Sequence, residues 1–62
     1  MEQFIVSLVN SGEYEHVKID AESYKTNGEG DLIFFVIEDG REKVVGKFNI
    51  WAWVSNAKNA HV

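Results

Sequence analysis

The segment 3–9 is rich in β-branched and apolar residues whose alternation with polar positions is loose, and a second segment follows from position 14. Between them, Ser11 and Gly12 lie in a small polar stretch of the kind that favours a tight turn. With these two residues at the tip, the segments pair as an antiparallel hairpin with an apolar side and a mixed side. The apolar side pairs Phe4 with Ile19 and Val6 with Val17, together with Leu8 and Ala21, while Ile5, Ser7 and Val9 lie opposite Lys18, His16 and Tyr14 on the mixed side.

Polar residues interrupt the second of these segments at 20–23, which predicts a bulge or bend before a strand resumes at 24–26. The stretch 27–30, Asn-Gly-Glu-Gly, combines short polar residues with two residues that tolerate positive φ. This chemistry predicts a tight turn that leads into the next strand.

The segment 32–37, Leu-Ile-Phe-Phe-Val-Ile, is an apolar run too short for a helix of ordinary length, and it predicts the central strand. Asp39-Gly40 then indicates a hairpin, by a two-residue or a four-residue loop, with a return strand over 42–50. Successive side chains alternate between the faces of a strand, so both faces of this hairpin are apolar. The face expected to close the core carries Ile33, Phe35 and Ile37 with Val44, Gly46, Phe48 and Ile50.

The opposite face of this hairpin is an apolar patch that a chain this small has difficulty covering, and we expect it to form an interface. Its candidate members are Phe34, Val36, Val45, Trp51 and Trp53. The two tryptophans share a face if the strand continues, and they point apart by about 200° if a short helix begins at Asn49. Each Trp can complete the core, contact another subunit or form a ligand platform. Residues 55–62 are expected to be a loose tail.

The expected fold is therefore a single all-β domain over residues 1–62, with four or five antiparallel strands in meander order and a possible short C-terminal helical turn. The strands form a small sandwich or a partly open barrel. A chain of 62 residues buries a small core, and nothing in the sequence supplies a helix long enough to cover the second face of a sheet. We therefore expect a homo-oligomer, with a symmetric dimer favoured.

Six Lys and Arg against ten Asp and Glu give a net charge of −4, with the basic residues scattered among the acidic ones. This balance disfavours nucleic acid as a partner, because phosphate-binding surfaces carry clustered positive charge. The N-terminal segment has neither a basic start nor an unbroken apolar run, so we expect no membrane association and a cytoplasmic location. The chain has no Cys, which excludes disulfides and thiolate metal sites.

No set of residues predicts catalysis, a cofactor site or a metal site, and the chain is not expected to be an enzyme. Glu15 and His16 are neighbours in a strand and therefore point to opposite faces. Asn27, Glu29 and Asp31 are spaced like the first ligands of a calcium loop. However, Leu32 stands at the position where such a loop needs glycine.

The order Asp31-Leu32-Ile33-Phe34-Phe35, Asp39-Gly40, Val44-Val45-Gly46-Lys47-Phe48 and Trp53-Val54 resembles a pattern found in short bacterial and phage β-hairpin proteins of unknown function. The resemblance covers about half of the chain, over residues 24–54. It implies a bacterial or phage accessory protein and carries no activity or site residue with it.

Two functions follow as expectations. The first is a non-enzymatic module for protein interaction or oligomerisation. The alternative is a small barrel that binds a ligand or nucleic acid through Trp51, Trp53 and Phe34, with Lys43 and Lys47 nearby; the acidic balance of the chain disfavours it.

Overall fold

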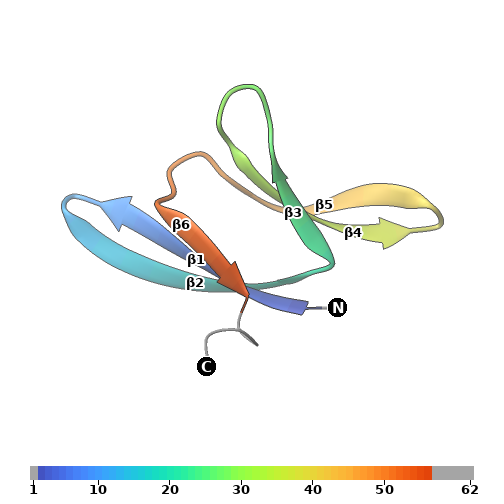
Figure 1. The fold of residues 1–62 in the computed structure, drawn as a ribbon, viewed down its shortest axis with the longest axis horizontal. Coiled ribbons are helices and arrows are strands. Elements are labelled where there is room, and N and C mark those ends of the chain that lie inside the picture. The colour runs from blue at the N-terminus through green and yellow to red at the C-terminus, as the bar shows by residue number, and fades with distance from the viewer. Residues whose placement is uncertain (1, 57–62) are drawn as a thin grey trace.

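The computed structural model of the chain describes residues 2–56, and these residues form six strands (Figure 1). Met1 and residues 57–62 lie outside the described part. The strands are β1 (Glu2–Asn10), β2 (Glu13–Ala21), β3 (Ser23–Thr26), β4 (Leu32–Glu38), β5 (Arg41–Phe48) and β6 (Trp53–Asn56). The expected all-β class is thus confirmed.

The six strands form two three-stranded antiparallel sheets, a first sheet in the order β2-β1-β6 and a second sheet in the order β3-β4-β5. The sheets do not close into a barrel, and the β1–β2 and β4–β5 hairpins extend in opposite directions (Figure 1). The predicted four- to five-stranded meander is wrong, because the last strand returns to the first. In β6, Trp53 lies opposite Ser7 and Asn56 opposite Phe4, a pairing that links the two ends of the described chain.

Both long hairpins turn through two residues. The sequence predicts the hairpin at Asp39-Gly40 but leaves its loop open between two and four residues, and the structure has the two-residue loop. Ser11 and Gly12 have φ values of 53° and 82°, and Asp39 and Gly40 have φ values of 54° and 75°. Two successive positive φ values are typical of the type I′ turn, whose twist matches that of the flanking strands. The β1–β2 register is confirmed, with Phe4 opposite Ile19 and Val6 opposite Val17.

The predicted interruption at 20–23 is a bend at Glu22, where the chain leaves the first sheet and enters the second. The Glu22 backbone N–H donates a hydrogen bond of 3.0 Å to the carbonyl oxygen of Phe35, so the chain is already attached to β4 at this point. The long strand that begins at Glu13 thus contributes β2 to one sheet and β3 to the other.

A β-bulge between β4 and β5 decides which face of this hairpin is buried. Phe35 lies opposite Val44 but Phe34 lies opposite Gly46, which leaves Val45 as the extra residue of β5. Beyond the bulge, Phe48 lies opposite Leu32 and therefore shares the face of Leu32, whereas Lys47 lies opposite Ile33. The sequence places Gly46 and Phe48 with Ile33, Phe35 and Ile37, and this assignment is wrong because one inserted residue shifts the alternation by one position.

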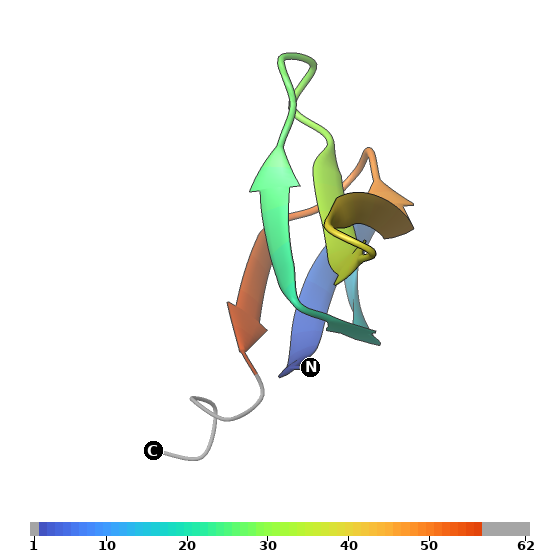
Figure 2. The ribbon, with the colours of Figure 1, turned by 90° about the vertical axis from the view of Figure 1, so that its right-hand side faces the viewer.

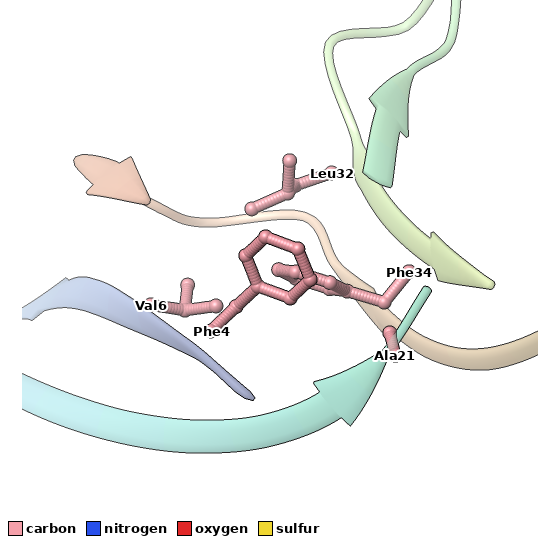
Figure 3. Packing of buried hydrophobic residues seen from close by; sticks show 5 residues of the cluster. All are labelled: Phe4, Val6, Ala21, Leu32 and Phe34. Carbon is pink, nitrogen blue, oxygen red and sulfur yellow. The ribbon is translucent and has the colours of Figure 1, made fainter. Parts of the chain in front are cut away.

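The core lies between the two sheets and takes its residues from β1, β2 and β4 (Figure 3). Its fully covered members are Phe4, Val6, Ala21, Leu32 and Phe34. The rings of Phe4 and Phe34 are 5.5 Å apart, and the Phe48 ring stands nearly perpendicular to that of Phe34 at 5.9 Å. By contrast, Ile37 and Val44, which the sequence assigns to the core, are 47% and 58% exposed.

The segment after β5 is a short connection followed by a strand. The short helix considered from Asn49 is not present in the described part of the chain, where residues 53–56 form β6. Ser55 and Asn56, predicted to begin a loose tail, are paired with Ile5 and Phe4, and the remainder of that predicted tail lies outside the described residues. Within residues 2–56, no helix has the length and apolar character needed to cross a membrane.

Candidate interaction surface

An aromatic surface occupies the face of the first sheet that points away from the core. The Tyr14 and Trp53 rings are 5.3 Å apart, and the His16 and Trp53 rings are 6.5 Å apart. Tyr14 is 60% exposed and Trp53 is 48% exposed, and Val9 beside Tyr14 is also exposed. We call Val9, Tyr14, His16 and Trp53 the aromatic patch.

The strand register explains why these side chains meet. Ser7 in the central strand β1 lies opposite His16 of β2 and also opposite Trp53 of β6. Residues directly opposite one another in antiparallel strands share a face, so Ser7 brings the two rings together. The Ala52 backbone N–H also donates a hydrogen bond of 2.7 Å to the Ser7 carbonyl oxygen, which fixes the start of β6.

The Ser7 hydroxyl lies beneath the aromatic patch and shares a hydrogen bond of 2.9 Å with His16 Nδ1. A Ser–His pair is the minimal arrangement of a nucleophile and its base. However, Ser7 is only 1% exposed, so a substrate cannot approach its hydroxyl in this arrangement. The hydrogen bond therefore serves to satisfy a buried hydroxyl and to fix the imidazole ring.

The structure does not bring the five sequence-predicted interface residues together. Phe34 is fully buried in the core, so it offers no surface to a partner. Trp51 is half-buried against the core and donates a hydrogen bond of 3.0 Å from Nε1 to the Gly30 carbonyl oxygen. Val36 and the exposed Val45 belong to the second sheet, and Trp53 alone of the five lies in the aromatic patch.

Tyr14 and His16 belong to the aromatic patch but are not among the interface residues predicted from sequence. The β1–β2 register already places both on the mixed side of the first hairpin, opposite Val9 and Ser7. The missing information was the position of Trp53, because only the pairing of β6 with β1 adds its ring to that side.

The residues that resemble the start of a calcium loop form a turn. Asn27 Oδ1 accepts hydrogen bonds from the backbone N–H groups of Glu29 (2.9 Å) and Asp31 (3.0 Å), and Asn27 Nδ2 donates to Asp31 Oδ2 (3.1 Å). The Asn27 oxygen is thus used by the backbone, as in an Asx turn. Across residues 2–56, no group of three or more His, Asp or Glu side chains is placed to hold a metal ion.

Replacing Asn27 with Ala is expected to lower the free energy of unfolding by about 1–3 kcal/mol. The substitution leaves the half-buried Asp31 N–H without its side-chain acceptor and removes the amide that contacts the buried Asp31 carboxylate. Urea unfolding followed by circular dichroism measures the change. Glu29→Ala, which keeps the Asn27 acceptor, is the control, and equal losses in the two variants would contradict this role of Asn27.

Three lysines of the second sheet form ion pairs with nearby carboxylates. Lys43 Nζ lies 3.4 Å from Glu38 and Lys47 Nζ lies 3.5 Å from Asp31. Lys25 Nζ contacts Glu42 at 2.6 Å and also lies 5.3 Å from the centre of the Phe35 ring, which it helps to cover.

Comparison of this chain with protein-family models, curated proteins and solved structures finds no match.

Proposed function

We propose that this protein is a non-enzymatic interaction module that associates with a second copy of itself through the aromatic patch. The observation that carries the proposal is the contact between Tyr14 and Trp53, two large rings 5.3 Å apart that remain about half or more exposed. Tyr and Trp are enriched among the residues that dominate binding energy at protein interfaces. Their apolar area is available to a partner at little cost in side-chain entropy.

The shape of the molecule supports a partner on this face. The chain measures 40 × 32 × 14 Å and is thin when viewed from the side (Figure 2). Its radius of gyration is 12.1 Å, whereas a compact domain of this length is expected to have about 10.6 Å. Among residues 2–56, five apolar residues are buried in the core, so the sheets retain apolar area that folding alone does not bury.

The size of the face sets the expected strength of association. The nine-residue strands β1 and β2 extend about 30 Å, the four-residue strand β6 extends about 13 Å, and neighbouring strands lie about 4.8 Å apart. The area of this face is therefore less than half of the about 800 Å² that each partner contributes to a standard stable interface. We therefore expect a dimer whose population depends on concentration, in which the outer faces of two first sheets pack together.

Light scattering behind size exclusion over a hundredfold range of concentration tests the proposal. The wild-type mass is expected to rise toward twice 7.1 kDa. Tyr14→Ser and Trp53→Ala are each expected to raise the dimer dissociation constant at least about thirtyfold, which corresponds to about 2 kcal/mol.

Val44→Ser is the matched control, because Val44 is equally exposed but belongs to the second sheet. Proton NMR spectra confirm that each variant is folded. A wild-type monomer at all concentrations, or a dimer weakened by Val44→Ser as much as by Tyr14→Ser, would refute the proposal.

A ligand-binding platform is the second candidate, because the tilted Tyr14 and Trp53 rings present exposed faces on which a sugar or base can stack. The basic residues considered for nucleic acid, Lys43 and Lys47, lie in the second sheet and are paired with Glu38 and Asp31. Titration of Trp emission with oligonucleotides and glycans separates the two candidates. Saturable quenching by either class in a monomeric protein would favour the platform.

A further inference from the structure

A pocket of about 270 Å³ lies on the other side of the first hairpin from the aromatic patch. The β1–β2 hairpin extends away from the second sheet, and the connection between β5 and β6 passes above it (Figure 1). The apolar part of the pocket comes from Leu8, Val9, Phe48 and Ile50. Glu15 and Lys47 supply its charges. Ile50 is 65% exposed, so an occupant of the pocket would cover a large aliphatic side chain that the fold leaves in water.

The position of Glu15 follows from the strand register. Tyr14 and Glu15 are adjacent in β2 and point to opposite faces, so Tyr14 joins the aromatic patch while Glu15 lies opposite Leu8 on the core side. This places a carboxylate beside an apolar pocket. Tyr14 and Glu15 thus lie on opposite faces of the hairpin, and Val9 is the one residue of the aromatic patch that also lines the pocket.

The two charges of the pocket differ in their partners. Lys47 Nζ lies 3.5 Å from Asp31 Oδ2, which compensates its charge. Glu15 contacts no positively charged group within 4.0 Å among residues 2–56. A neighbouring hollow shares Lys47 with the pocket and adds the carboxylates of Glu29 and Asp31. The uncompensated charge at this site is therefore negative.

We propose that this pocket binds a peptide segment of a partner protein in which a large aliphatic residue stands next to Lys or Arg. The volume is just below that of pockets for drug-sized molecules, which start at about 300 Å³, and it suits one side chain rather than a whole cofactor. The aliphatic side chain packs against Leu8, Phe48 and Ile50, and the adjacent cation lies beside Glu15. The net charge of −4 favours the approach of such a segment.

The probe for this site is the capped peptide acetyl-Gly-Leu-Arg-Gly-amide, titrated into ¹⁵N-labelled protein and followed by backbone amide shifts. The protein carries Trp53→Ala throughout, so that self-association through the aromatic patch does not contribute. Saturable shifts are expected at Leu8, Glu15, Phe48 and Ile50. Glu15→Gln is expected to raise the peptide dissociation constant about two- to fivefold, the range of an exposed ion pair.

Glu22→Gln is the matched control, since it removes the same charge from an exposed residue at the bend between the sheets. It is expected to leave the dissociation constant unchanged. Peptides with Glu in place of Arg, or with Ala in place of Leu, are expected to bind more weakly than the original peptide.

Three results would overturn the proposal: no saturable shift with the Leu-Arg peptide, equal affinity for the Arg and Glu peptides, or shifts centred on Tyr14 and His16 instead of the pocket. Each of these results is independent of whether the unmodified protein forms a dimer. Failure of this proposal is thus distinguishable from failure of the proposed self-association.

Discussion

Replacing Phe34 with Ala is expected to lower the free energy of unfolding by about 3–5 kcal/mol. Phe34 is fully buried, and its ring contacts those of Phe4, Tyr24 and Phe48 at centroid distances of 5.5, 5.7 and 5.9 Å. The substitution removes these contacts and leaves a cavity at the point where the two sheets meet. A chain of 62 residues has a total stability of about 3–9 kcal/mol, so the substitution is expected to remove at least about a third of it.

Phe35→Ala is the matched control, because it removes the same ring from the next residue of β4. Phe35 is half-buried and points to the other face, where the Lys25 ammonium lies 5.3 Å from the centre of its ring. Thermal and urea unfolding of both variants, followed by circular dichroism, measures the difference. A loss at Phe35 equal to or larger than the loss at Phe34 would mean that the core lies on the face assigned to it from sequence.

Replacing Gly46 with Ala is expected to lower the free energy of unfolding by about 1–3 kcal/mol. A Cβ atom at this position would lie 2.3 Å from Ile19 Cδ1, which is far inside van der Waals contact. Ile19 belongs to the first sheet and Gly46 to the second, and the substitution would force the end of the Ile19 side chain into another rotamer. Gly46 thus allows the two sheets to approach beside the β-bulge.

The contact with Ile19 gives this prediction a specific test. Ile19→Val removes the Cδ1 atom, so Gly46→Ala is expected to cost less in the Ile19→Val background than in the wild type, with a favourable coupling in the double-mutant cycle. Gly28→Ala is the control for the change of residue type, because nothing lies within 4 Å of a Cβ there and its φ is not in the left-handed region. Strictly additive effects of Gly46→Ala and Ile19→Val would contradict the proposed contact.

The parts of the fold that the sequence predicts correctly depend on neighbours in the chain. Ser11-Gly12 and Asp39-Gly40 form two-residue turns with positive φ at both positions, and such a turn fixes the register of the strands beside it. The Phe4–Ile19 pairing follows from the turn alone. The interruption near Glu22 is likewise visible as a polar break in the apolar pattern.

The predictions from sequence are wrong where the fold depends on a β-bulge and on the pairing of two strands that lie far apart in the chain. The bulge between Phe34 and Phe35 arises where β4 and β5 bend against the first sheet, and nothing in the local alternation marks Val45 as the extra residue. The fifth and sixth strands are separated by a connection, and the partner of β6 is β1 at the other end of the chain. The position of Trp53 beside Tyr14 and His16 depends entirely on that pairing.

The sequence by itself determined the all-β class, the two tight hairpins and the first register, because turn chemistry and period-two alternation act over a few residues. The tertiary structure decided which face of β4 is buried, that Trp51 packs against the core while Trp53 remains on the surface, and that Glu15 lies beside an apolar pocket. These outcomes depend on how two sheets pack and on which strands become neighbours. Both are set by the free energy of the whole chain rather than by any single segment.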